Sequence, residues 1–298
     1  MLHATLALQV FGTGDTSDNS SDEGRTQLMF DSGLTESRAM RSRQSCSHIE
    51  VVAHRGATYS YDYYAPENTF ASTAEAVRLG ATVIEVDVQV TLDGVHVLLH
   101  DSTVDRTTNG TGSINQMTWA EVQTLEAVHP FWKGEPQRVP SFAESLLWAR
   151  DFGVDFDLHM KSNQVESALQ IIQDMGVQHH VFMTSSNSDV IARTRAFDPT
   201  IRIMPKTTGV ESTLENLALF DPKPEQMEIK DGGFTPENIA LMHQNGVKVF
   251  MNSLGVRDVL AVLGNTQGFA QLVDAGIDLI QTDFPATLTD YLQAKCGK

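Results

Sequence analysis

The sequence predicts an α/β fold and, within that class, a closed (β/α)8 TIM barrel. From residue 49 onward, short runs rich in β-branched residues alternate with amphipathic segments, which is the pattern of a parallel sheet covered by helices. Several amphipathic segments end in glycine, as helices commonly do, and eight apolar runs can be counted. An open doubly wound sheet is the alternative, but no glycine-rich dinucleotide fingerprint follows the first run.

The expected elements can be placed in order along the chain. We expect strands to begin near residues 50, 82, 155, 181, 201, 226, 247 and 278. We expect helices in the amphipathic segments at 70–80, 142–153, 164–176, 189–197, 237–246, 269–276 and 286–295. Active sites of such barrels lie at the carboxyl ends of the strands, so polar residues at those ends are candidates for function.

One apolar run does not fit the alternation. Residues 95–101 follow the second strand after little more than Asp93-Gly94, which is too short for the crossover that parallel strands need. Asp-Gly favours a hairpin turn, so we expect an extra hairpin that brings His100 near the second strand. The segment after it, with Phe131 and Trp132, is expected to form a small insertion or lid.

Composition limits the remaining possibilities. Residues 1–48 are expected to be a disordered or processed leader, and residues 49–298 the barrel domain. A formal net charge of -17 argues against nucleic acid or an anionic membrane surface as partner. No apolar run is long enough for a transmembrane segment, and the lack of a clear signal peptide favours a cytoplasmic location. Cys46 and Cys296 fit no metal or redox spacing. Oligomeric state is left open.

The second strand carries two acidic residues on one face. Strand alternation places Glu85 and Asp87 on one side and apolar Ile84 and Val86 on the other. Two carboxylates in an apolar strand are costly to bury without a cation between them. The strand predicts a divalent metal site, with ion pairs to basic side chains as the alternative.

The third strand has a similar polar face. Alternation places Asp155, Asp157, His159 and Lys161 on one side of the strand. Lys161, at the end of the strand, can reach a phosphate group. Either His159 or Asp157 can complete the metal shell.

Several ordered motifs strongly resemble those of the glycerophosphodiester phosphodiesterase family, whose members are α/β barrels related to phosphatidylinositol-cleaving phospholipases. The resemblance runs from about residue 49 to the C-terminus and is densest between residues 54 and 112. It rests on HRG at 54–56, APENT at 65–69, IEVDVQVTLDGVHVLLHD at 84–101 and RTTNGTG at 106–112.

The resemblance implies a role for several residues within or after these motifs. It implies an acid/base pair (His54 and His100), phosphate-binding cations (Arg55 and Lys161) and metal ligands (Glu85 and Asp87, with Glu67 beside the metal). Where this family usually has a glutamate as the third metal ligand, this chain has His159. An imidazole ligand favours Mn²⁺ or Zn²⁺ over Mg²⁺ or Ca²⁺. We therefore expect one divalent ion held in part by His159, with substitution by Asp157 or weak metal binding as alternatives.

Phosphodiester hydrolysis needs a base, an acid and cations that offset charge on the phosphoryl oxygens, and these residues supply all three. The resemblance implies hydrolysis of small glycerophosphodiesters, such as glycerophosphocholine, to glycerol 3-phosphate and an alcohol. One alternative is a lipid phosphodiesterase resembling sphingomyelinase D or a lysophospholipase D. The other is a non-catalytic barrel that binds phosphodiesters.

Other residues have open interpretations. Asn68 or Thr69 is expected to cap the first helix. The tyrosines at 59, 61, 63 and 64 either stack on a head group or pack within their loop. Asn252 and Asp283 follow the last two strands and either contact substrate or make local hydrogen bonds.

Overall fold

The computed structural model describes residues 49–59 and 63–296, and its centre is a ring of eight parallel strands. The strands in chain order are β1 (Glu50–His54), β2 (Val83–Val90), β4 (Asp155–Met160), β5 (Val181–Ser185), β6 (Arg202–Thr207), β7 (Gln226–Ile229), β8 (Lys248–Asn252) and β9 (Leu279–Thr282). β1 pairs in parallel with both β2 and β9, which closes the sheet. The eight predicted strands and the (β/α)8 barrel are therefore confirmed. The predicted leader, 1–48, lies outside the described residues.

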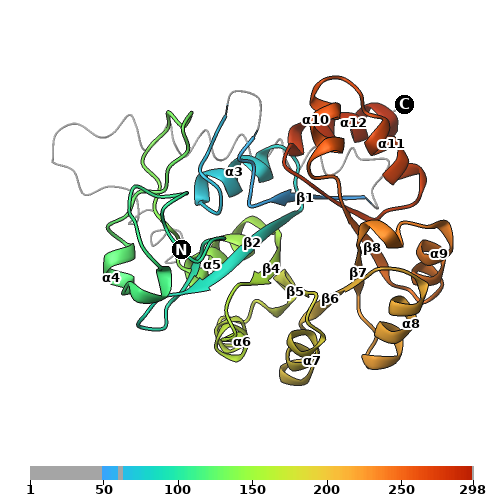
Figure 1. Ribbon diagram of the computed structural model, residues 1–298, viewed down its shortest axis with the longest axis horizontal. Helices are drawn as coiled ribbons and strands as arrows, with labels where there is room; N and C mark the ends of the chain where they lie inside the picture. The colour runs from blue at the N-terminus through green and yellow to red at the C-terminus, as the bar shows by residue number, and fades with distance from the viewer. Residues whose placement is uncertain (1–48, 60–62, 297–298) are drawn as a thin grey trace.

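The helices lie outside this ring (Figure 1). They are α3 (Phe70–Arg78), α5 (Phe142–Phe152), α6 (Val165–Asp174), α7 (Ser188–Phe197), α8 (Val210–Leu219), α9 (Pro236–Gln244), α10 (Val256–Val262), α11 (Gln267–Asp274) and α12 (Pro285–Cys296). Local sequence fixes several starts: Thr69 and Ser141 each form a capping box with the residue three positions later. Among the described residues, no helix is long and apolar enough to cross a membrane.

Two helices, α8 and α10, are absent from the expectations above. Their patterns do not mark a broad buried face: Thr213 is the buried residue of α8, and Asp258 and Ala261 are those of α10. The large apolar residues of α10 are instead exposed, as Val256 and Val259 illustrate. Amphipathic periodicity predicts helices only where the apolar stripe is buried.

The predicted hairpin is present and shorter than expected. Strand β3 (His96–Leu98) runs antiparallel to β2, and the amide of Thr91 donates to the carbonyl of Val95 across the turn. The insertion that follows contains the 3-10 turn η1 (Ile114–Gln116) and the short helix α4 (Trp119–Val122). Its own small core consists of Val97, Leu99, Val104, Ile114, Val122 and Val139.

Two layers inside the barrel determine where chemistry can occur. The first layer is an apolar cluster inside the ring of strands, which consists of Val52, Val83, Phe182, Met204, Phe250 and Leu279. Two residues further along each strand, on the same face, the side chains become polar, as in His54, Glu85, Thr184 and Lys206. The carboxyl end of the barrel is therefore lined by polar and ionisable groups above an apolar layer.

Candidate active site

The first strand delivers His54 and Arg55 to the carboxyl end of the barrel through a tight change of direction. Arg55 has φ 54° and Gly56 has φ 86°, a left-handed conformation that favours glycine. A Cβ at Gly56 would lie 2.6 Å from Oγ of Ser72 and 2.7 Å from its carbonyl carbon. Glycine after His54-Arg55 is thus required both by the backbone and by the close approach of α3.

The imidazole of His54 is fixed from the far end of the chain. Its Nδ1 lies 2.7 Å from Oδ1 of Asp283, just after β9, and its Nε2 lies 3.8 Å from Oε2 of Glu85. Burial alone would lower the pKa of His54, but the hydrogen bond to Asp283 and the charge of Glu85 raise it above its usual range. With Nδ1 engaged, Nε2 is the nitrogen left to exchange a proton with a substrate.

Asp283 is itself held in place by Asp258 of α10. The buried Oδ2 of Asp258 accepts the backbone N–H of Asp283 at 2.7 Å. Its Oδ1 accepts from the hydroxyls of Ser253, at 2.5 Å, and Thr282, at 2.8 Å. These bonds connect the ends of β8 and β9, so α10 determines where the partner of His54 lies.

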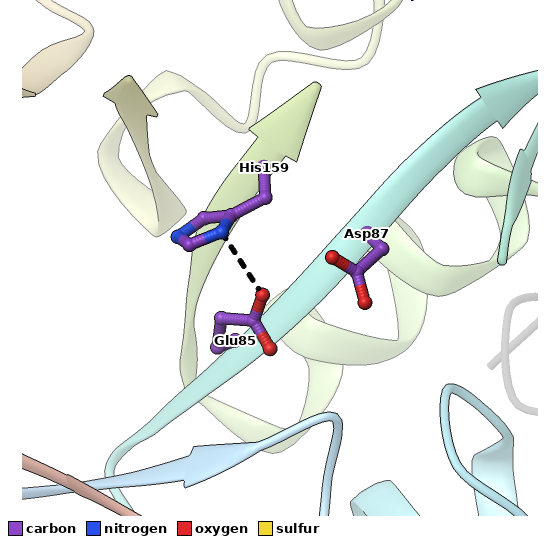
Figure 2. A group of neighbouring side chains, drawn as sticks. All are labelled: Glu85, Asp87 and His159. Carbon is purple, nitrogen blue, oxygen red and sulfur yellow. Dashed lines mark ion pairs between the residues drawn. The ribbon is translucent and has the colours of Figure 1, made fainter. Parts of the chain in front are cut away.

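Glu85 and Asp87 lie on β2 beside His159 of β4, as predicted (Figure 2). Each offers a ligand atom, and these atoms all lie within 4.8 Å of one another. In register, Glu85 is opposite His54 on one side and Asp157 on the other, and Asp87 is opposite His159. Both carboxylates are 1% exposed.

The electrostatics of this group differ between its two carboxylates. Burial and the neighbouring Asp87 raise the pKa of Glu85. Burial would also raise the pKa of Asp87, but Lys161, whose Nζ lies 2.8 Å from its Oδ1, and Arg55 lower it. Asp87 is therefore stabilised as the ionised carboxylate, whereas Glu85, whose pKa is raised to about 7, is only partly ionised at neutral pH.

His159 bridges two acidic residues. Its Nδ1 lies 3.2 Å from Oε1 of Glu85 and its Nε2 lies 3.4 Å from Oδ2 of Asp157. Burial would lower the pKa of His159, but Asp157 and Glu85 raise it to about 9. The hydroxyl of Thr184 donates to the other oxygen of Asp157.

The donor set fits a divalent cation. Two buried carboxylates on one strand repel each other unless a cation lies between them, and the elevated pKa of Glu85 reflects that cost. Two carboxylates with one imidazole suit a metal of intermediate softness. Glu85, Asp87 and His159 are thus the residues that could hold such an ion.

Glu67 lies outside this group of three, and its carboxylate pairs with two arginines. Oε1 of Glu67 is 3.0 Å from Nη1 of Arg55. Arg106 donates to both of its oxygens at 2.7 and 2.9 Å, and also to both oxygens of Asp101. Asp101 in turn lies 2.6 Å from Nδ1 of His100. A chain of ion pairs, ending in the Asp101–His100 hydrogen bond, therefore connects the phosphate-binding candidate Arg55 to His100.

Two contributors to this site were missed by the sequence analysis. Arg106 lies within the motif at 106–112, but its contacts join Asp101 of its own segment to Glu67, which is 39 residues away in sequence. Asn68, at φ 56°, does not cap α3, which Thr69 does. Instead its amide donates to Oδ2 of Asp87 at 3.0 Å, and its side-chain oxygen accepts the Asp87 N–H at 3.3 Å. Asparagine tolerates positive φ better than most residues. Its place directly after Glu67 is the signal that could have identified Asn68 as part of the site.

The aromatic loop packs against the insertion. The ring of Tyr64 stacks on His129 with centroids 5.6 Å apart, and Tyr59 meets His129 edge-on at 5.8 Å. Tyr63 contacts Trp132 edge-on at 5.1 Å. Of the two predicted roles for the tyrosines, packing is observed for these three, and Tyr61 lies outside the described residues.

Comparison with known proteins agrees with this geometry. Residues 54–287 match the model of the glycerophosphoryl diester phosphodiesterase family. The chain is 30% identical over 259 residues to a glycerophosphodiester phosphodiesterase of Caldanaerobacter subterraneus subsp. tengcongensis, covering 82% of this chain and 97% of that protein. A glycerophosphodiester phosphodiesterase structure from Agrobacterium tumefaciens is similar with a TM-score of 0.65 and 25% identity, covering 81% of this chain and 99% of that one.

A second solved structure supports the fold. It is a phosphodiesterase of Oleispira antarctica in complex with its product sn-glycerol-3-phosphate, with a TM-score of 0.66 and 21% identity, covering 84% of this chain and 99% of that one. The family match runs from His54, the last residue of β1, past the end of β9 and so covers the other seven barrel strands in full. The chain therefore belongs to the glycerophosphoryl diester phosphodiesterase family and is a phosphoric diester hydrolase that cleaves glycerophosphodiesters.

Proposed function

We propose that this enzyme is a metal-dependent hydrolase of small glycerophosphodiesters, such as glycerophosphocholine, that releases glycerol 3-phosphate and an alcohol. The observation that carries the proposal is the grouping of Glu85, Asp87 and His159 beside His54, whose Nε2 is 3.8 Å from Glu85. A proton-transfer group and a cation-binding group that share one carboxylate can act on the same phosphate.

The two histidines are proposed to share the proton transfers. One removes the proton from the attacking hydroxyl and the other donates a proton to the leaving alkoxide. In the first step the substrate's own 2-hydroxyl attacks phosphorus and gives a cyclic phosphate. Water then opens this ring, with the roles of His54 and His100 exchanged. Each imidazole has its Nδ1 on a carboxylate, Asp283 for His54 and Asp101 for His100, which leaves Nε2 for the substrate.

Cations offset the charge that grows on the phosphoryl oxygens. Arg55 presents a fixed fork of donors, which suits a phosphate, and Lys161 adds a compact charge. A divalent ion held by Glu85, Asp87 and His159 would polarise a phosphoryl oxygen as a Lewis acid when bound. The imidazole of His159 favours Mn²⁺ or Zn²⁺ over Mg²⁺ or Ca²⁺ in this role. Glu67 is proposed to support the site by orienting Arg55, to which it is paired at 3.0 Å.

The experiment that tests the proposal identifies the products. Purified enzyme is incubated with glycerophosphocholine and Mn²⁺, and phosphorus NMR separates glycerol 3-phosphate from phosphocholine. We expect glycerol 3-phosphate and free choline, with cyclic glycerol phosphate as a transient species. Formation of phosphocholine would mean that the other ester bond is cleaved and would contradict the proposal.

The lipid phosphodiesterase alternative is not favoured by the family match, and a matched pair of substrates separates it. Glycerophosphocholine and lysophosphatidylcholine differ only in the acyl chain. We expect higher kcat/KM for glycerophosphocholine, measured below the micelle concentration of the lipid. A preference for the acylated substrate would support the alternative instead.

A further inference from the structure

A second charged cluster lies at the carboxyl end of the barrel, on β6, β7 and β8. The Nζ of Lys206 is 2.7 Å from Oε2 of Glu228, and the Nζ of Lys230 is 2.8 Å from its Oε1. The amide of Asn252 also donates to that Oε1 at 3.1 Å. We call these four residues, Lys206, Glu228, Lys230 and Asn252, the β6–β8 cluster. The mechanism above uses none of them.

The cluster carries one more positive charge than its buried carboxylate needs. Glu228 is 1% exposed. Burial would raise the pKa of Glu228, but Lys206 and Lys230 lower it, so the group is ionised. One lysine suffices to neutralise one carboxylate. A second ammonium on the same carboxylate adds repulsion between like charges, and the side chain of Lys230 remains 45% exposed.

The cluster also contains an unused acceptor. Oδ1 of Asn252 is buried and has no hydrogen-bond partner among the described residues. A buried acceptor without a partner costs free energy. A ligand hydroxyl that donates to it would remove that cost.

The cluster lies near the reacting groups. Lys206 is on the inward face of β6, two strands from His159, and its charge acts on both His159 and Asp157. In the ring, β6 and β7 lie across from β1 and β2, so one arm of a phosphodiester held by Arg55 and Lys161 can point towards them. The glycerol arm carries only hydroxyl groups, so a second anionic group must belong to the alcohol arm.

We propose that Lys206 and Lys230 form a subsite for an anionic group on the alcohol part of the substrate, a phosphate monoester or a carboxylate, while Asn252 accepts from a neighbouring hydroxyl. The inference rests on the proposed glycerophosphodiester activity and names the substrate class within it. Ammonium groups bind such anions through charge-assisted hydrogen bonds. The same net positive charge disfavours the trimethylammonium group of choline.

The test compares kcat/KM for four substrates: glycerophosphocholine, glycerophosphoglycerol, glycerophosphoserine and glycerophosphoinositol 4-phosphate. They present, in that order, a cationic alcohol, a neutral alcohol, a zwitterionic alcohol with a carboxylate, and a phosphate-bearing alcohol. The variant is Lys230→Met, because Lys230 is half exposed and its loss leaves the Lys206–Glu228 pair intact. The matched control is Lys223→Met, since Lys223 precedes β7 at the opposite end of the barrel and contacts Asn245.

We expect the wild-type enzyme to prefer the phosphate-bearing substrate. Lys230→Met should lower kcat/KM about 10-fold or more for that substrate, the effect of losing one charge-assisted hydrogen bond, and change it less than about twofold for glycerophosphoglycerol. A loss with glycerophosphoserine as well assigns the subsite to anions in general, and a loss confined to the phosphate substrate assigns it to phosphate monoesters.

Equal effects on all four substrates, or no effect on any, would overturn the subsite while leaving the activity intact. Absence of glycerol 3-phosphate from all four with the wild-type enzyme would instead reject the proposed activity. Lys223→Met should leave every kcat/KM unchanged. A selective loss in this control would also overturn the assignment, because it would trace the effect to net charge.

Discussion

The Nδ1 atom of His54 lies 2.7 Å from Oδ1 of Asp283, although 229 residues separate the two along the chain. His54 ends the first barrel strand and Asp283 follows the last, so closure of the barrel creates the contact. The carboxylate fixes the orientation of the ring and directs Nε2 away from β9. The pairing of the first and last barrel strands thus positions the proposed acid/base group.

Replacing Asp283 by asparagine should lower kcat more than it raises KM. The amide keeps the shape but loses the charge that favours the protonated ring, so we expect kcat to fall by about 10-fold or more, less than for loss of the imidazole. His54→Ala provides the reference. A rise in KM with unchanged kcat would mean that Asp283 acts only in substrate binding.

Replacing His100 by alanine tests the second histidine. We expect kcat to fall by ~10²–10⁴-fold, the usual contribution of a general acid or base, with substrate affinity largely kept. His179→Ala is the matched control, because His179 lies in the turn η2 (Gln178–His180) that precedes β5 at the other end of the barrel. Activity within about tenfold of wild type for His100→Ala would remove it from the mechanism.

Replacing His159 by glutamate should change metal preference. A third carboxylate makes the donor set all-oxygen, which suits Mg²⁺ and Ca²⁺, whereas the imidazole favours Mn²⁺ or Zn²⁺. We expect the ratio of Mg²⁺ affinity to Mn²⁺ affinity, measured by calorimetry on metal-free protein, to rise in His159→Glu. An unchanged ratio would show that residue 159 does not contact the ion.

Removing the charge of Glu228 should make stability depend less on pH. Burial would raise its pKa, but Lys206 and Lys230 lower it below the unfolded value. Its contribution to stability is therefore present above the unfolded pKa of about 4.3 and is lost as pH falls through the folded pKa. At pH 7 the free energy of unfolding, measured by urea titration, should be larger for wild type than for Glu228→Gln. This difference should shrink as the pH is lowered towards 3. A difference in unfolding free energy that does not change with pH would show that the substitution acts through packing and not through charge.

Much of the architecture is predictable from the sequence because it depends on local patterns of apolar and polar residues. The barrel strands are short apolar runs whose alternation also placed Glu85 and Asp87 together on the inward face. The hairpin follows from Asp93-Gly94, which leaves no room for a crossover. Helix α10 was missed because its apolar residues, Val256 among them, face outward. Periodicity cannot mark a helix whose apolar side is not buried.

The support of the site was less predictable because it depends on long-range contacts. The contact of Arg106 with Glu67 spans 39 residues and depends on how the segment after the hairpin folds. Asp283 was recognised as a residue at a strand end, but its partner could not be assigned before the barrel was closed. Asn68 looked like a helix cap because the adjacent Thr69 performs that role.

The most direct test of the central claim is release of glycerol 3-phosphate from glycerophosphocholine by chelator-treated enzyme, with Mg²⁺, Ca²⁺, Mn²⁺, Zn²⁺ and Co²⁺ added back singly. We expect no turnover without metal and the greatest recovery with an ion that accepts imidazole. Glu85→Gln should bind that ion more weakly and recover little. Full turnover by metal-free enzyme, or no release with any of the five ions, would contradict a metal-dependent glycerophosphodiesterase centred on Glu85, Asp87 and His159.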